Sequence, residues 1–235
     1  MATKPIVAVA GATGFVGQAL VRTLCADHRV VGLSRNPPQA GTGPDVEWRR
    51  CDLFSLMQVE KALEGAQQAV YLVHSMMPSA RLTQGNFSDM DLICADNFAR
   101  AAARAGVRHI VYLGGLIPDA SELSQHLRSR LEVEAALGSR GVPVTALRAG
   151  IVIGPGGSSY KIFKTLVEKV PLLLCPAWAD SLTQPVALPD VLELLRYCLA
   201  HPARVSCSHD IGSPDVMSYR QLLERTAAIL GLRRV

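Results

Sequence analysis

The stretch PIVAVAGATGFVGQALV, residues 5–21, places three glycines between a short apolar run and a helical pattern. Gly11, Gly14 and Gly17 follow directly after the run PIVAVA and stand three residues apart. Glycines in such a turn let the backbone bend tightly and approach a pyrophosphate, which free N–H groups and the helix dipole stabilise. The same triplet fits an ordinary strand-to-helix turn, but its position between a strand and a helix predicts a dinucleotide-binding loop.

The chain around this loop alternates between two kinds of segment. Short runs rich in β-branched residues lie at 5–10, 29–33, 46–50, 69–73, 109–113 and 144–153. Helical patterns lie between them, near 15–26, 56–64, 87–105 and 121–139. Strands that are apolar along their length and alternate with helices predict a parallel sheet covered on both faces. The predicted fold class is therefore α/β, a doubly wound Rossmann sheet.

The rhythm changes after residue 150. The run Gly154-Pro155-Gly156-Gly157 interrupts the pattern, and prolines punctuate the residues that follow. Helices are expected at 158–169, 190–200 and 218–230, with Ser158, Asp190 and Ser218 as N-caps. We interpret residues 1–235 as a single domain, with a Rossmann core at 1–150 and a small C-terminal α/β substrate lobe at 151–235.

Composition narrows the classes of protein to consider. The net charge of +4 is small and the basic residues are scattered, which argues against nucleic-acid binding. The six cysteines include no C-x-x-C pair and no zinc-like spacing with histidine, so we expect a reduced, cytoplasmic protein without a metal site. The N-terminus lacks a signal-peptide pattern, and the apolar stretch at 170–179 is too short to span a bilayer. The oligomeric state cannot be read from the sequence.

The second predicted strand ends in GLSRNP, which bears on the choice of cofactor. Sites for NAD usually carry an acidic residue here that binds the ribose hydroxyls, whereas this chain has Ser34 and Arg35. A cation at this point favours the extra 2′-phosphate of NADP and makes NAD less suitable. The alternative is a solvated arginine at a strand end.

Five motifs resemble the short-chain dehydrogenase/reductase superfamily, specifically its atypical, NmrA-like branch of NAD(P)-binding proteins. They are GATGFVG at 11–17, CDL at 51–53, VYLVHSM at 70–76, HIVYLGGL at 109–116 and LRAGIVIGPGG at 147–157. The resemblance covers nearly the whole chain and implies a Rossmann fold that binds NAD(P).

The resemblance also implies which residues contact the cofactor. Asp52 and Leu53 correspond to the dipeptide that packs against the adenine. His74 lies in the segment that borders the nicotinamide ribose, although a packed histidine at a strand end is an equal alternative. The full implied set is Gly11, Thr13, Gly14, Phe15, Val16, Gly17, Ser34, Arg35, Asp52, Leu53, Val73, His74, Ser75, Arg130, Gly150 and Ile151.

One departure from the family pattern concerns catalysis. Enzymes of this superfamily usually have Ser or Thr after the fifth strand and Tyr-x-x-x-Lys on the next helix, but this chain has Gly114-Gly115, then His126 and Arg130. His126 could replace the tyrosine as proton donor, and Arg130 could contact the cofactor or substrate.

The same helical stretch also offers surface pairs at i,i+4 spacing, Arg128 with Glu132 and Arg130 with Glu134. We expect Arg128 and Glu132 to form a solvent pair, and His126 and Arg130 to face the cofactor.

Three functions fit these residues. The first is an NADP-dependent oxidoreductase that reduces a small apolar carbonyl or enone by hydride transfer. The second is an NmrA-like regulator that senses the NADP redox state and signals through a protein partner. The third is a redox-assisted epimerase or dehydratase.

The substrate lobe is less informative than the core. Tyr160, Phe163, Trp178 and the run at 172–174 could line an apolar pocket, but core packing is the favoured interpretation. Cys175 and Cys207 have no histidine at a spacing that suggests nucleophilic catalysis.

Overall fold

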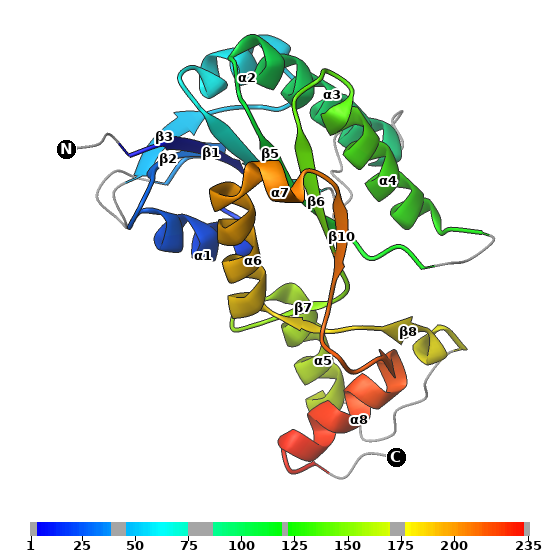
Figure 1. The fold of residues 1–235 in the computed structure, drawn as a ribbon. Helices are drawn as coiled ribbons and strands as arrows, with labels where there is room; N and C mark the ends of the chain where they lie inside the picture. Colours follow the sequence, from blue (N-terminus) through cyan, green and yellow to red (C-terminus); the bar gives the residue numbers. More distant parts are fainter. Residues whose placement is uncertain (1–3, 39–45, 75–86, 119–121, 170–176, 233–235) are drawn as a thin grey trace. The chain divides into compact units, whose positions relative to one another are not determined.

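The computed structural model describes residues 4–38, 46–74, 87–118, 122–169 and 177–232 (Figure 1). The chain forms two compact units, one of Met1–Arg148 with Leu192–His209 and the other of Ala149–Val191 with Asp210–Val235.

The described residues form a seven-stranded sheet in the order β10-β6-β5-β4-β1-β2-β3. Parallel pairing joins β1 to β2 and β4, β2 to β3, and β4 to β5. The predicted doubly wound α/β fold is therefore confirmed. The strands are β1 (Ile6–Ala10), β2 (Arg29–Ser34), β3 (Val46–Arg50), β4 (Gln68–Tyr71), β5 (Ile110–Gly115), β6 (Val144–Ala149) and β10 (Ser208–Ile211).

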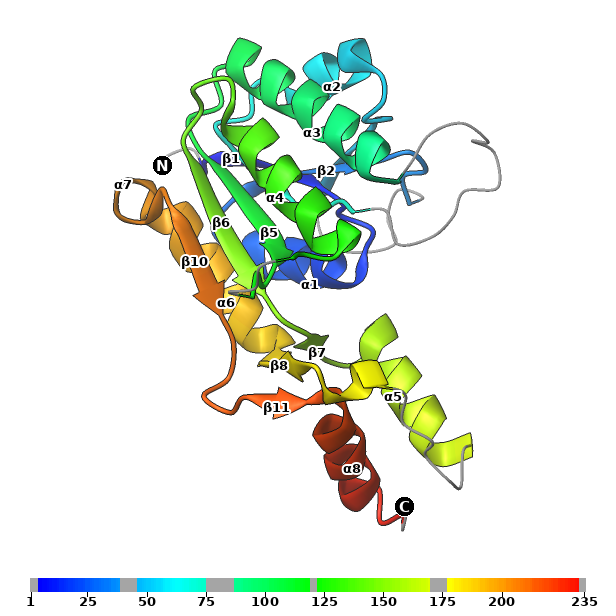
Figure 2. The ribbon, with the colours of Figure 1, turned by 90° about the vertical axis from the view of Figure 1, so that its right-hand side faces the viewer.

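Helices cover both faces of this sheet, as the apolar character of the strands requires. On one face α3 packs between α2 and α4, and α1 and α6 lie on the other face (Figures 1 and 2). Strand β1 is buried along nearly its whole length, and the core beneath α2, α3 and α4 is rich in Ala and Val. The helices are α1 (Phe15–Leu24), α2 (Leu56–Leu63), α3 (Phe87–Arg104), α4 (Gln125–Gly138), α6 (Leu188–Ala200) and α7 (Pro202–Val205).

A late segment of the chain, Leu192–His209, belongs to the first unit by its contacts. Gln68 donates to the carbonyl of Leu199 at 2.7 Å, Thr145 donates to the carbonyl of Val205 at 2.7 Å, and Arg196 pairs with Asp27 at 2.8 Å. The sequence interpretation placed this segment in the lobe, because periodicity does not reveal such long-range contacts. The division into core and lobe stays a prediction.

The second unit combines two small sheets with two helices. The expected strand at 144–153 is divided, since β6 ends at Ala149 and Val152 begins β7. Phe163 and Val167 of α5 pack against Leu222, Leu223 and Ala227 of α8. The elements are β7 (Val152–Ile153), α5 (Ser158–Lys169), η1 (Ala177–Asp180), β8 (Leu182–Thr183), β9 (Val186–Ala187), β11 (Met217–Ser218) and α8 (Tyr219–Ile229).

The expected N-caps differ in their outcome. Ser218 caps α8 and forms a capping box with Gln221. Asp190 lies inside the first turn of α6, because that helix already begins at Leu188, and Ser158 is the first residue of α5. In the part of the chain that the structure describes, no helix is both long and apolar enough to cross a membrane.

Candidate dinucleotide site

The order of the strands fixes where a ligand can bind to the first unit. β1 lies between β2 and β4. The chain adds β2 and β3 on one side of β1 and then continues with β4 on the other side, so the order of the strands reverses at β1. Such a switch point opens a crevice at the carboxyl ends of the two central strands. Here the backbone N–H of Leu72 donates to the carbonyl of Ala10 at 3.0 Å, and a Cβ on Gly11 would lie 3.1 Å from the carbonyl of Leu72. With φ at 83°, Gly11 also adopts a conformation that side chains disfavour.

The glycine loop occupies this switch point. The N–H of Gly14 donates to the carbonyl of Gly11 at 2.9 Å, and a Cβ on Gly17 would lie only 2.1 Å from that same carbonyl oxygen. Any side chain at position 17 would therefore push α1 away from the loop. Thr13 and Gly14 are exposed, and Phe15 and Val16 are half-buried.

The N-terminus of α1 is suited to an anion. Gly14 is its N-cap and provides no side-chain hydrogen bond, and the first turn holds no acidic residue. The first N–H groups of the helix therefore keep their capacity to bind a phosphate, which the helix dipole also favours. Gln18 steadies the loop by donating to the carbonyl of Thr13 at 2.7 Å.

Arg35 lies exposed just beyond β2. Two neighbouring arginines, Arg29 and Arg49, both pair with Glu47, at 2.8 and 2.7 Å. Within the described ranges no carboxylate forms an ion pair with Arg35, so its guanidinium can reach a ligand phosphate. Ser34 instead stabilises the turn, its hydroxyl accepting from the N–H of Asn36 at 3.2 Å.

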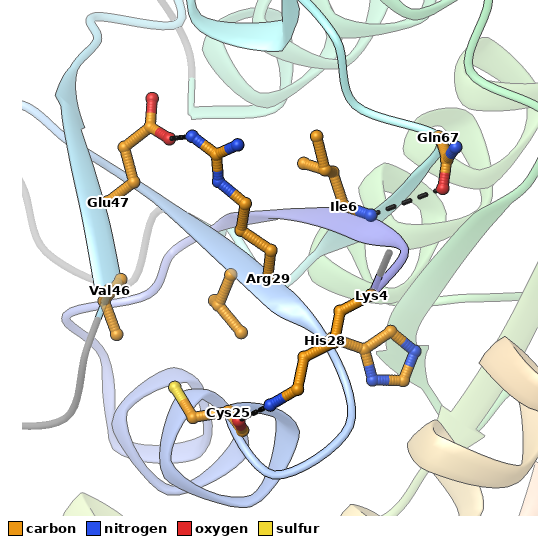
Figure 3. A pocket seen from close by; sticks show the side chains of 9 residues that line it. Lys4, Ile6, Cys25, His28, Arg29, Val46, Glu47 and Gln67 are labelled. Atoms are coloured by element: carbon orange, nitrogen blue, oxygen red, sulfur yellow. Dashed lines mark hydrogen bonds and ion pairs between the residues drawn. The ribbon is translucent and has the colours of Figure 1, made fainter. Parts of the chain in front are cut away.

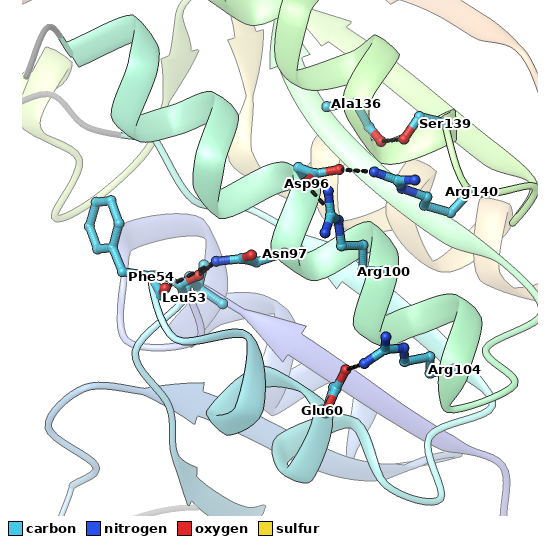
Figure 4. A network of polar contacts seen from close by, with 10 residues as sticks. All are labelled: Leu53, Phe54, Glu60, Asp96, Asn97, Arg100, Arg104, Ala136, Ser139 and Arg140. Atoms are coloured by element: carbon cyan, nitrogen blue, oxygen red, sulfur yellow. Dashed lines mark hydrogen bonds and ion pairs between the residues drawn. The ribbon is translucent and has the colours of Figure 1, made fainter.

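Asp52 and Leu53 lie in a turn between β3 and α2. The Asp52 carboxylate accepts from the N–H of Phe54 at 3.1 Å, so this residue has a structural task in the turn. Asn97 of α3 donates to the carbonyls of Leu53 and Phe54, at 2.9 and 3.1 Å (Figure 4). Asn97 thus fixes the loop that the sequence assigns to the adenine, and the sequence analysis did not single it out.

The face of α4 that turns inward carries Arg130. Ser129, Arg130, Val133 and Leu137 are buried, and the exposed fraction of Arg130 is only 5%. Its stem lies over the end of β5, because a Cβ on Gly115 would be 3.5 Å from Arg130 Cγ. His126 lies one turn earlier and is exposed. Gly114 and Gly115 provide no side-chain hydroxyl at this end of the sheet.

The expected solvent pair of Arg128 with Glu132 is wrong, because the described residues show no ion pair between them, whereas the expectation that Arg130 faces inward agrees with its burial. Glu134 accepts two hydrogen bonds from Arg148 of β6, at 3.0 and 2.8 Å, and a further one from Ser208. Arg130 turns into the core instead, and neither it nor Arg128 forms an ion pair with a carboxylate of the described residues. The helix face therefore decides the partners, and i,i+4 spacing alone does not.

Asp91 of α3 is a buried acid that the sequence analysis missed, with an exposed fraction of 6%. Its negative charge acts to raise the pKa of His74 and of His126, against the desolvation and the Arg130 cation that lower both. The signal was present in the sequence, because an aspartate occupies the apolar face of α3 that also carries Ala95 and Phe98.

Both histidines titrate below their ordinary range. Desolvation lowers the pKa of His126, and the Arg130 cation lowers it further. Desolvation, followed by Arg130, lowers the pKa of His74 to about 4. Both residues are exposed, so water screens part of these effects. At neutral pH both imidazoles are therefore uncharged.

The remaining predicted residues fall in different places. Val73 is half-buried just beyond β4, and Ser75 lies outside the described residues. Gly150 and Ile151 belong to the second unit, where a Cβ on Gly150 would lie 2.4 Å from the carbonyl of Gln184 and Ile151 accepts from the N–H of Val186 at 2.9 Å. Their contact with the nicotinamide stays a prediction.

Among the lobe residues whose side chains the structure describes, Phe163 follows the core interpretation and Tyr160 does not. Phe163 is buried and stacks on Tyr219 with ring centroids 6.3 Å apart, whereas Tyr160 is exposed. The run at 172–174 and the side chain of Trp178 lie outside the described residues.

Cys207 has a histidine neighbour that the sequence analysis did not anticipate. Its Sγ lies 3.2 Å from Nε2 of His209, which is on β10 just after Cys207. Cys175 lies outside the described residues.

A cavity of about 900 Å³ lies at the amino ends of the strands, away from the glycine loop (Figure 3). It is lined by the first residues of β1, β2 and β3 and by the turn after α1. Lys4 crosses it and donates to the carbonyl of Cys25 at 3.0 Å. No residue of the predicted site lines this cavity, since the glycine loop follows the carboxyl end of β1.

A parallel sheet with a glycine loop at its switch point, opening onto an uncapped helix N-terminus, defines a dinucleotide-binding protein of the Rossmann class. The chain belongs to the NAD(P)H-binding family, whose pattern is matched by residues 11–168.

Solved structures share this fold across nearly the whole chain. MoeE5 in complex with UDP-glucuronic acid and NAD has a TM-score of 0.77 and 22% identity, over 98% of this chain and 84% of that one. The UDP-glucose 4-epimerase of Thermus thermophilus, in complex with NAD, has a TM-score of 0.77 and 19% identity, over 97% and 84%. The Citrobacter sp. triphenylmethane reductase with NADP(H) has a TM-score of 0.77 and 18% identity, over 98% and 78%.

A curated relative is similar in sequence over a shorter stretch. The auxiliary protein GraX of Staphylococcus aureus (strain NCTC 8325 / PS 47) is 38% identical over 114 residues, which are 48% of this chain. The chain spans only 37% of the length of that relative.

Proposed function

We propose that the protein is an NADP-dependent oxidoreductase that transfers hydride to a small apolar carbonyl or enone. The observation that carries this proposal is the pairing of a glycine loop that excludes a Cβ at Gly17 with Arg35, a cation beyond the next strand that pairs with no described carboxylate. A pyrophosphate fits the first, and a 2′-phosphate fits the second. Structural neighbours that include a reductase with NADP(H) support the same chemistry.

The residues of this chain would hold the cofactor along the crevice. The N–H groups after Gly14 bind the pyrophosphate, Arg35 binds the 2′-phosphate, and Arg130 donates to ribose hydroxyls or to the substrate. When bound, the nicotinamide supplies the hydride. The protein then has to supply one proton and stabilise the oxygen that receives it.

His126 is the group we assign to the proton. Its lowered pKa leaves it neutral at pH 7, so it gives a proton readily only in mildly acidic solution. The Arg130 cation opposes the charge on His126 but offers fixed N–H donors for the developing oxyanion. We therefore propose that reduction depends on a small protonated fraction of His126.

The test is consumption of NADPH absorbance over a panel of small carbonyls and enones. We expect turnover with at least one apolar compound, and His126→Ala should lower turnover while NADPH affinity stays nearly constant. Full turnover by this variant would remove His126 as proton donor. Tight NADPH binding with no turnover on any compound would contradict the oxidoreductase proposal.

A second candidate is a regulator that senses the NADP redox state through a protein partner. Two observations favour it: Gly114-Gly115 offer no hydroxyl to a substrate, and the curated relative is named an auxiliary protein. A sensor must bind the oxidised and reduced cofactor with different affinity, because equal affinity shifts no equilibrium. Isothermal titration with NADP and NADPH tests this, and identical dissociation constants remove the sensor.

A further inference from the structure

Tyr112 and Gly114 lie two residues apart on β5 and so face the same side of the sheet. Tyr112 is completely buried. A Cβ on Gly114 would lie 2.8 Å from Tyr112 Cε1, 3.3 Å from Cζ and 3.4 Å from the hydroxyl oxygen. Carbon atoms do not approach so closely, so the tyrosine ring occupies the volume that a side chain at position 114 would need.

The hydroxyl of Tyr112 reaches α4 at Arg130. It donates to the backbone carbonyl of Arg130 at 3.4 Å. Burial raises the pKa of Tyr112 to about 12, although the charge and hydrogen bonding of Arg130 act in the opposite direction. The stem of Arg130 passes over the next residue of the strand, 3.5 Å from a Cβ built on Gly115. Both the backbone and the side chain of Arg130 therefore rest on the end of β5.

The ring of Tyr112 is held in place by its aromatic neighbours. Its centroid lies 6.1 Å from that of Tyr71, which in turn meets Phe98 edge-on at 5.0 Å. Because all three rings are buried, rotation of Tyr112 away from α4 would require the cluster to repack. The hydroxyl thus has a fixed position at the turn of α4 that carries Arg130.

We propose that Tyr112 is the positioning residue for Arg130. Its ring excludes a side chain at position 114, and its hydroxyl fixes the turn from which the guanidinium reaches the crevice. The chain thus has a buried hydroxyl that acts through Arg130, two residues before the glycine at the position where the superfamily pattern usually has a serine or threonine. This inference rests on the proposed function, because it matters only if Arg130 contacts the dinucleotide.

The first test is the NADPH dissociation constant of Tyr112→Phe, measured by fluorescence titration. Loss of one net hydrogen bond should weaken binding by about fivefold. Tyr71→Phe removes the hydroxyl of the adjacent buried tyrosine, which no hydrogen bond of the described residues joins to Arg130, and should bind NADPH like the wild type. Thermal unfolding of both variants checks that the fold is kept.

A double-mutant cycle separates positioning from packing. Arg130→Leu alone should weaken NADPH binding, and Tyr112→Phe added to it should have no further effect, because its action passes through Arg130. Independent, additive effects would overturn the inference. Weaker binding by Arg130→Leu together with unchanged binding by Tyr112→Phe would overturn it too, while leaving the proposed function intact. Unchanged binding by Arg130→Leu would overturn both.

A matched pair of glycine variants tests the ring itself. Gly114→Ala forces the Tyr112 ring to shift and should weaken NADPH binding at least as much as Tyr112→Phe does. Gly115→Ala adds the same methyl group at an ordinary contact distance and should bind NADPH as the wild type does. Equal affinities for the two variants would contradict the inference.

Discussion

The two ends of the dinucleotide site differ in which atoms fix their geometry. At the β1–α1 end, backbone atoms fix the geometry, since a Cβ on Gly17 would meet the carbonyl oxygen of Gly11 at 2.1 Å. At the β5–α4 end, side chains fix it, with Arg130 turned inward and Glu134 held by Arg148. The β1–α1 end tolerates almost no substitution, whereas the β5–α4 end has other residues at all three positions of the triad that is usual in the superfamily. We therefore expect that cofactor binding and the proposed reduction can be lost separately.

The largest effect is expected from Gly17→Ala. Its methyl group cannot fit against a backbone carbonyl, so α1 must move. We expect the free energy of unfolding to fall by about 3 kcal/mol and NADPH binding to be lost. Urea denaturation and NADPH titration measure both. Gly138→Ala is the control, because its Cβ would meet only Val144 at 3.9 Å. Its unfolding free energy should change by at most about 1 kcal/mol, toward greater stability. Equal effects of the two variants would place the constraint elsewhere.

The second effect concerns the pH dependence of reduction. Because burial and Arg130 lower the pKa of His126, the protonated form is a minor fraction at neutral pH and increases as the pH falls. The rate of carbonyl reduction should therefore rise from pH 8 to pH 6, and His126→Gln should be about a hundredfold slower and independent of pH. Rates are measured under saturating NADPH. A rate that falls with acidification would assign His126 the role of a base.

The third effect is smaller and concerns the choice of cofactor. Arg35→Ala should weaken NADPH binding by about tenfold, as expected for one charge-assisted hydrogen bond, and leave NADH unchanged. Arg108→Ala removes an exposed arginine that precedes β5 and should alter neither dissociation constant. An unchanged ratio of NADPH to NADH affinity in Arg35→Ala would show that the strand-end cation is only solvated.

The smallest effect is a stability change that belongs to neither end. His109 is completely buried, its Nε2 bonds to Thr145 Oγ1 at 2.7 Å, and its Nδ1 has no partner among the described residues. Burial lowers the pKa of His109, so below pH 6.5 the unfolded chain takes up a proton that the folded chain refuses.

Stability should accordingly fall with acidification, by about 1 kcal/mol between pH 7.5 and pH 5.5 from this residue. His109→Gln keeps a donor for Thr145. Between pH 7.5 and pH 5.5 its free energy of unfolding, measured by urea denaturation, should fall by about 1 kcal/mol less than that of the wild type. Parallel losses in variant and wild type would assign the pH dependence to other groups.

The same contrast explains what the sequence reveals. Gly11 and Gly17 can be recognised in the sequence because the backbone geometry disfavours any side chain there, and the strands can be recognised because both faces of the sheet are buried. The interaction partners of the charged side chains on α4 cannot be predicted in the same way. Arg130 and Glu134 have ideal helical spacing, yet they point to different neighbours, and only the packing of α4 on β5 and β6 decides this.

Two further residues escaped the sequence analysis for different reasons. The signal for Asp91 was present, because this residue shares the apolar face of α3 with Ala95 and Phe98, whereas Asn97 acts on a loop more than forty residues away. The sequence pattern indicates that Tyr112 is a core residue on a strand, and the structure agrees. Its link to Gly114 appears only when the distance from its ring to the missing Cβ is measured.

The contacts of Leu192–His209 also bear on how the first unit folds. Gln68 and Leu199 are separated by 131 residues, and Asp27 and Arg196 by 169. Loop closure over such distances is costly in entropy and slow, so these contacts form late. During synthesis the glycine loop leaves the ribosome early, yet the sheet it belongs to stays incomplete until β10 follows. A fragment that stops near residue 150 would carry the glycine loop and the strand-end residues that follow it, and would still lack β10, the edge strand of its sheet.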